Sequence, residues 1–166
     1  MIDPIELLQR LVQTPSVNPT FSKDADVTGE GELARLIAGE LEEWGFTVEL
    51  QEVFPGRSNL VAFREGRTAE AIGLCAHLDT MPPDGMTVPA FDAVVRDGCV
   101  WGRGSADTKG SIAAMLTAVR AELDEHPGRV PSLLIVLTCD EEAHFTGAQR
   151  FAEAAHPDLA GMVIGE

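Results

Sequence analysis

A histidine and an aspartate two residues apart, His77 and Asp79, are the first candidates for chemistry in this sequence. They follow residues 71–76, a run of small and apolar residues that predicts a strand buried on both faces. Open α/β sheets bind ligands at the carboxyl ends of their strands, so the pair stands where a site would form. Asp79 could hold one imidazole nitrogen while the other faces a metal ion. A core histidine followed by a turn-forming aspartate would give the same pattern.

Consecutive acids follow the most strongly apolar run, residues 130–138, in the same way. In the sequence Asp140-Glu141-Glu142, one carboxylate could bind a metal ion while its neighbour takes a proton from metal-bound water, as in metal-assisted hydrolysis. Alternatively, these acids stabilise the N-terminus of a following helix, which would give the same sequence pattern. Glu166, at the end of another apolar run, is either a further ligand or a surface acid.

A glycine-rich segment, WGRGSADTKG at residues 101–110, is the third candidate. It resembles phosphate-binding loops, but GxGxxG requires glycine at the position of Asp107, and a Walker A loop requires glycine immediately before Lys109. A carboxylate in the turn suits a cation better than a phosphate, and Asp107 could bridge two cations. Alternatively, Asp107 caps the helix that follows it.

Taken in order, AHLDTMPP, GRGSADTKG and TCDEEAHFTGA resemble the leading motifs of the dinuclear zinc hydrolases. That family includes aminoacylase, acetylornithine deacetylase, succinyl-diaminopimelate desuccinylase and glutamate carboxypeptidase, and the likeness spans nearly the whole chain. The resemblance implies two Zn²⁺ ions, with Co²⁺ or Mn²⁺ as alternatives. It implies that His77 binds one ion, that Asp107 bridges both and that Glu142 binds the other.

The same resemblance assigns the remaining roles. Glu141 is implied to be the general base that activates a metal-bridging water, and Asp79 to orient the metal-binding histidine. Glu166 is implied to be a further ligand of the ion held by that histidine, and a cis peptide is expected after the bridging aspartate, between residues 107 and 108. His144 departs from the family pattern, in which many members have glycine, and could alter the pocket wall.

The reaction implied is amide hydrolysis of an N-acyl amino acid or a short peptide with a free carboxylate. Family members also have a lid domain that mediates dimerisation, and a further histidine ligand far downstream; neither is present in these 166 residues. We therefore expect residues 1–166 to be the N-terminal portion of a catalytic domain, weakly active or inactive alone, from a homodimeric full-length enzyme. A non-catalytic short form that binds a partner is the main alternative, and a nucleotide-binding module rests only on the glycines.

The composition is that of a globular domain, with 45% hydrophobic and 23% charged residues. An excess of 27 acids over 12 bases gives a net charge of -15, which argues against nucleic acid and anionic membranes as partners. We find no signal-peptide pattern and no apolar run of membrane-spanning length. The cysteines Cys75, Cys99 and Cys139 are expected to be reduced interior thiols of a cytoplasmic protein.

The elements that must position these residues alternate between helix and strand. We predict an α/β fold of three layers, with a largely parallel (mixed) sheet and helices on both faces, zinc-peptidase-like and incomplete at the C-terminus. Helices are expected over residues 3–12, 31–44, 108–123 and 146–155. Strands are expected over residues 46–53 and 58–64 at the sheet edge, over 71–76, 130–138 and 161–164, and in a hairpin over 93–101.

Overall fold

Five strands form the central sheet of the structure, a computed structural model that describes residues 2–166. The sheet order is β1-β2-β6-β3-β7, and β4 and β5 form a separate two-stranded sheet. The strands are β1 (Thr47–Phe54), β2 (Arg57–Arg64), β3 (Ala71–His77), β4 (Val94–Arg96), β5 (Cys99–Trp101), β6 (Ser132–Thr138) and β7 (Leu159–Ile164). The helices are α1 (Pro4–Val12), α2 (Gly31–Glu43), α3 (Lys109–Glu125) and α4 (Thr146–Ala152).

The sheet is mixed, as predicted. Strand β3 pairs in parallel with both β6 and β7, whereas β2 is antiparallel to β6 and to β1. The expectation that β2 lies at the sheet edge is wrong, because β6 pairs with its other side. Its side chains are covered on both faces, with Leu60 and Ala62 in one hydrophobic cluster and Val61 and Phe63 against another. Strand β1 is the edge on this side.

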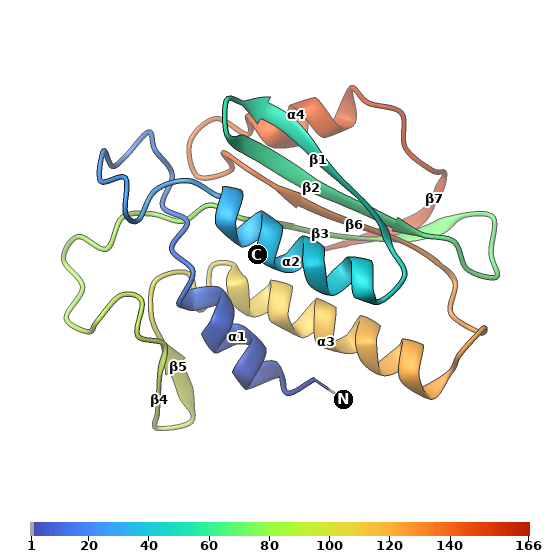
Figure 1. Cartoon of the computed structure of the whole chain (residues 1–166), viewed down its shortest axis with the longest axis horizontal. Helices are drawn as coiled ribbons and strands as arrows, with labels where there is room; N and C mark the ends of the chain where they lie inside the picture. Colours follow the sequence, from blue (N-terminus) through green and yellow to red (C-terminus); the bar gives the residue numbers. More distant parts are fainter. Residues whose placement is uncertain (1) are drawn as a thin grey trace.

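Helices cover both faces of the sheet, which gives the predicted three layers (Figure 1). Helices α1, α2 and α3 pack together on one face over the larger hydrophobic cluster, which includes Leu11, Leu41 and Leu116. Helix α4 lies on the other face, where its Phe151 packs against the smaller cluster around Leu134. Every residue of β6 is buried, so this strand is the centre of the domain.

Local sequence signals explain where the first elements begin and end. The carboxylate of Asp3 caps α1 by accepting hydrogen bonds from the main-chain N–H groups of Ile5 (2.7 Å) and Glu6 (3.2 Å). Pro4 occupies the first turn, where a main-chain N–H would have no acceptor within the helix, so the proline costs no hydrogen bond. After α2, Gly45 adopts a φ of 82°, a left-handed conformation that ends the helix and lets the chain turn back into β1.

The hairpin of β4 and β5 forms as predicted around Asp97-Gly98, both of which have positive φ. It stands outside the main sheet and is tied to α1, because the side-chain amide of Gln9 donates to the carbonyl of Ala93 (2.9 Å). Its second strand leads directly into the glycine-rich segment. The hairpin therefore fixes the entry to that segment.

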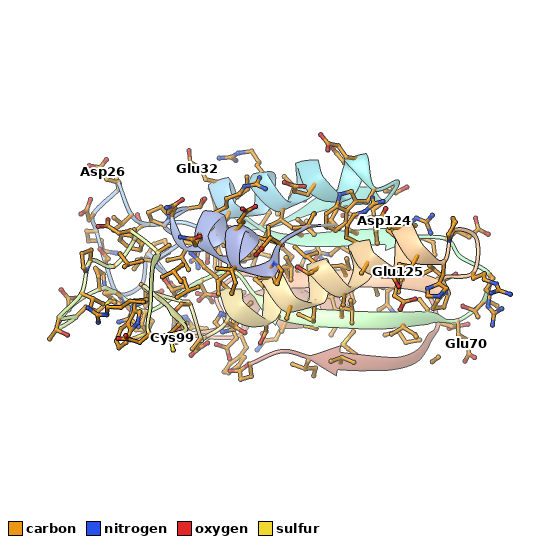
Figure 2. The ribbon with its side chains drawn as sticks, turned by 90° about the horizontal axis from the view of Figure 1, so that it is seen from below. Asp26, Glu32, Glu70, Cys99, Asp124 and Glu125 are labelled. Atoms are coloured by element: carbon orange, nitrogen blue, oxygen red, sulfur yellow. The ribbon has the colours of Figure 1, made fainter. Side chains whose placement is uncertain are left out.

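Acidic side chains are spread over the surface instead of being gathered on one patch. Figure 2 shows the exposed acids Asp26 and Glu32 toward one end of the molecule and Glu70, Asp124 and Glu125 toward the other. Much of the negative charge is thus solvated surface. None of the helices between residues 2 and 166 is both long and apolar enough to cross a membrane.

The three cysteines are free thiols, but they are not all interior as predicted. Cys139 is buried and Cys75 is half-buried, whereas Cys99 is exposed at the hairpin (Figure 2). The error arises because the hairpin stands outside the sheet, so its apolar residues do not face the core. Burial raises the pKa of the Cys139 thiol to about 12 and, with Glu166 nearby, raises the pKa of Cys75.

We expect Cys99 to react far faster than the other two thiols with a disulfide reagent at pH 8, because it is exposed, whereas burial restricts access to Cys75 and Cys139 and raises their pKa. Thiol titration of the native protein should show a fast phase of one equivalent, which Cys99→Ser abolishes and Cys75→Ser leaves intact. Unfolding should expose the remaining thiols. A fast phase of two or three equivalents in the native protein would contradict the burial of Cys75 and Cys139.

Candidate active site

His77, the last residue of β3, presents both ring nitrogens to oxygen atoms. Its Nδ1 lies 2.9 Å from the main-chain carbonyl oxygen of Asp79, and its Nε2 lies 2.8 Å from Oδ1 of Asp107. A carbonyl can only accept, so Nδ1 carries a proton and Nε2 is the nitrogen available to a metal ion. The ring is 2% exposed, which fixes its orientation.

Asp79 orients His77 through its main-chain carbonyl oxygen and not through its side-chain carboxylate. Its main-chain carbonyl holds the ring, while its carboxylate lies 3.8 Å from Nδ1. Because that carboxylate is too far from the imidazole for a hydrogen bond, it can accept hydrogen bonds from other donors. It accepts the main-chain N–H of Glu141 (3.0 Å) and that of Glu142 (3.1 Å), so Asp79 links the end of β3 to the loop after β6.

Asp107 reaches the site from outside the sheet, at the start of α3. The peptide bond between Asp107 and Thr108 is cis, as the resemblance implied. The helix cap is Thr108, so the alternative that Asp107 serves as N-cap is wrong. The Asp107 side chain is 62% exposed, with one oxygen on the imidazole of His77.

The glycine-rich segment gives Asp107 its position through close packing. Gly104 has a φ of +79°, and a Cβ there would lie 2.8 Å from Thr80 and 3.3 Å from the Lys109 side chain. Lys109 is fully buried and donates from Nζ to the carbonyl of Thr14 (2.8 Å), and burial lowers its pKa to about 7. Close packing in this turn thus accounts for the glycine at position 104 without a phosphate-binding role.

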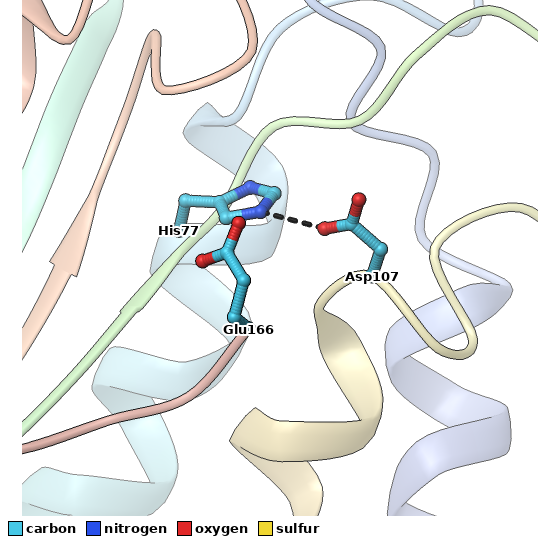
Figure 3. A group of neighbouring side chains, drawn as sticks. All are labelled: His77, Asp107 and Glu166. Carbon is cyan, nitrogen blue, oxygen red and sulfur yellow. Dashed lines mark hydrogen bonds and ion pairs between the residues drawn. The ribbon is translucent and has the colours of Figure 1, made fainter.

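Glu166 joins these residues because of the parallel register. Cys75 pairs with Ile164, and the N–H of Gly165 donates to the carbonyl of Cys75 (2.8 Å), so the chain leaves β7 beside His77. Ligand atoms of His77, Asp107 and Glu166 all lie within 4.8 Å of one another. Figure 3 shows the imidazole facing the carboxylates of both acids.

Glu141 and Glu142 lie in the loop after β6, outside the group of His77, Asp107 and Glu166 whose ligand atoms approach one another. Oε2 of Glu141 lies 3.8 Å from Nε2 of His77. Burial raises the pKa of both glutamates, and neighbouring carboxylates raise it further. The alternative that these acids stabilise a helix N-terminus fails, because α4 begins only at Thr146.

The electrostatics of this cluster suit a cation. Burial alone would lower the pKa of His77, but the carboxylates of Asp79, Asp107 and Glu141 outweigh it and hold that pKa above its ordinary value. Raised pKa values on an imidazole and on glutamates together mean that negative charge is in excess. One imidazole nitrogen with several carboxylate oxygens is a donor set that fits Zn²⁺ or a similar ion.

A buried ion-pair network behind the cluster escaped the sequence analysis. Arg57 forms a two-pronged pair with Glu30 (2.8 and 2.5 Å) and also reaches Asp140 (3.4 Å). Burial by itself raises the pKa of Asp140, but bonds from Thr146 and Asn18 and the charge of Arg57 lower it overall. Asp140 is thus a structural carboxylate, and no local motif signals its partner Arg57. His144 is exposed, with its ring 3.5 Å from Asp140.

The comparison with known proteins decides the family. A family model described as peptidase family M20/M25/M40 matches residues 73–166, which is more than half of the chain. The chain belongs to peptidase family M20/M25/M40. The suspected resemblance is therefore confirmed, and a metal cofactor is implied for the M20/M25/M40 site.

Solved structures show the same fold. A di-peptidase from Saccharomyces cerevisiae matches with a TM-score of 0.79 at 18% identity, over 97% of this chain and 37% of that chain. Human carnosine dipeptidase 1 matches with 0.76 at 19% identity, over 97% and 38%. A Zn-dependent exopeptidase from Parabacteroides distasonis matches with 0.64 at 17% identity, over 97% and 59%. This M20/M25/M40 chain thus spans less than two thirds of each.

We expect Zn²⁺ to bind this M20/M25/M40 site more tightly as the pH rises through the pKa of His77. A proton on Nε2 competes with the metal, so affinity is weakest below that pKa and levels off above it. Calorimetric titration in buffers of different ionisation enthalpy should show proton release on binding. His126→Ala, at an exposed histidine, should leave this dependence unchanged. Equal affinity at pH 5.5 and 8 would contradict the assignment.

Proposed function

We propose that this site belongs to a metal-dependent amide hydrolase that removes an acyl group from an N-acyl amino acid or cleaves a short peptide with a free carboxylate. The observation that carries the proposal is the convergence of His77, Asp107 and Glu166 with the Glu141 carboxylate beside them. Family membership supports hydrolysis, and dipeptidases among the similar structures support a small substrate.

Imidazole and carboxylate donors of this kind suit zinc, and we propose two ions. His77 and Glu166 would hold one ion, Glu142 would hold the other, and the exposed carboxylate of Asp107 would serve both. When bound, the ions polarise the amide carbonyl and lower the pKa of water toward neutrality. Co²⁺ or Mn²⁺ would use the same oxygen and nitrogen donors.

Glu141 is the proposed general base. Its carboxylate is partly buried, and burial raises its pKa above the ordinary value for glutamate, which suits a group that must take up a proton and release it near neutral pH. It would accept the proton of the attacking water and then deliver it to the leaving amine. Its main-chain N–H donates to the carboxylate of Asp79, which fixes the backbone from which the side chain extends.

The remaining features of the whole enzyme are also proposals. The matched structures are much longer than this chain, so we place substrate-carboxylate recognition, a lid and dimer contacts outside residues 1–166. The net charge of -15 supports a small-molecule substrate in place of nucleic acid or an anionic membrane. A cytoplasmic location is consistent with the free cysteines.

We expect Glu141→Gln to lower kcat by about 10²- to 10⁴-fold while zinc remains bound, because an amide cannot take up the proton. The assay should use the polypeptide from the complete reading frame that contains residues 1–166, with zinc and a panel of dipeptides and N-acyl amino acids. Product amine is measured by derivatisation, and bound zinc by elemental analysis.

The matched control is Glu125→Gln, which makes the same chemical change at an exposed helix end. Its kcat and zinc content should equal those of the wild type. Hydrolysis that persists in Glu141→Gln would reject the proposed base. Absence of zinc-dependent hydrolysis across the whole panel in the wild type would reject the proposed function.

A further inference from the structure

We propose that Asn18 is a positioning residue for the two glutamates after β6, although it touches neither of them. Its side-chain amide joins the carboxylates of Asp79 and Asp140, which lie in the loops that follow β3 and β6. The inference rests on the proposed function, because it concerns how Glu141 and Glu142 are held for that reaction.

The contacts of Asn18 define its orientation fully. Nδ2 donates to Oδ2 of Asp79 (2.8 Å) and to Oδ1 of Asp140 (3.1 Å), while Oδ1 accepts the N–H of Thr20 (2.9 Å). Carboxylates accept only, so the nitrogen of the amide must face them. The residue is fully buried, and its own N–H donates to the carbonyl of Thr80 (2.9 Å).

Asparagine meets a specific electrostatic need at this position. Asp79 and Asp140 are both buried, and two carboxylates that approach each other without donors between them repel. The NH₂ group of Asn18 gives one hydrogen to each and adds no charge. An aspartate of the same shape offers no such pair of donors.

The effect on the glutamates follows from the other bonds of these carboxylates. Asp79 accepts the main-chain N–H groups of Glu141 and Glu142, and Asp140 precedes them in the chain with a left-handed φ of 63°. The loop is thus held at its start by the Asp140 side chain and along its length by Asp79. Asn18 is the one group described here that bonds to both carboxylates.

The direct test is amide hydrogen exchange in the metal-free protein. We expect Asn18→Asp to accelerate exchange at the N–H groups of residues 141 and 142 by roughly ten-fold or more relative to the amides of β6, because the accepting carboxylate loses its position. Asn18→Ala, which removes the donors without adding charge, should act in the same direction. It provides the measurement if Asn18→Asp does not fold.

A core variant controls for general destabilisation. Leu41→Ala empties a fully buried position in α2 and should lower stability without a selective effect on residues 141 and 142. Unchanged protection at these two amides in Asn18→Ala, or acceleration that is uniform along the chain, would overturn the inference.

Function provides the second readout. In the zinc-loaded complete polypeptide, we expect Asn18→Ala to lower zinc affinity or kcat by about 10- to 100-fold, the usual effect of removing a partner behind a metal ligand. KM should change little, because Asn18 does not contact the substrate site. If the wild type hydrolyses no amide, the proposed function fails, while the exchange result still decides whether Asn18 positions the loop.

Discussion

Repulsion between carboxylates is the constraint on which this structure depends. Asp107, Glu141 and Glu166 approach His77 at one end of the sheet, and Asp79 lies behind the ring. Like charges at such distances destabilise a fold unless donors or cations compensate them. Burial alone would lower the pKa of His77, but the surrounding carboxylates raise it overall, so negative charge at the ring is in excess.

The sheet brings these groups together through register. Strands β3, β6 and β7 run in parallel, and the pairings His77↔Thr138 and Cys75↔Ile164 make their carboxyl ends level. Glu141, three residues beyond β6, and Glu166, two residues beyond β7, then stand beside the histidine. Asp107 is the exception, since it arrives at the start of α3, where Gly104 packs on Lys109.

The sequence was informative wherever a signal was local. The cap Asp3, the hairpin turn at Asp97-Gly98 and the apolar run of β6 each produced the expected element, because the physical cause lies within a few residues. The motif resemblance supplied the candidate site residues, and the cis peptide that it implied after Asp107 is present. These are properties that short stretches carry by themselves.

Long-range partners could not be foreseen in this way. No local signal marks Asn18 as a partner of Asp79, and nothing near Arg57 points to Glu30, since such pairs depend on how distant segments pack. The interior position of β2 and the exposure of Cys99 were missed for the same reason. The position of β2 depends on its pairing with β6, and the exposure of Cys99 depends on the hairpin facing solvent.

Burial and donors together separate the two kinds of acid in this domain. Glu30, Asp79 and Asp140 are almost completely inaccessible, and each accepts hydrogen bonds from Arg57, Asn18 or main-chain N–H groups. These carboxylates have permanent partners and hold the loops. Because these acids are buried among their donors, they are poorly placed to receive a cation from solvent.

The second kind is partly or largely exposed. Asp107 is 62% exposed and Glu141 22%, and the oxygen of each that approaches His77 faces a ring nitrogen that a metal ion would use. Among the described residues, the Asp107 carboxylate bonds only to the ring of His77 and the Glu141 carboxylate to no donor, so both remain available to a cation. The division of the acids into these two kinds is therefore an argument for the metal site that does not depend on the motif.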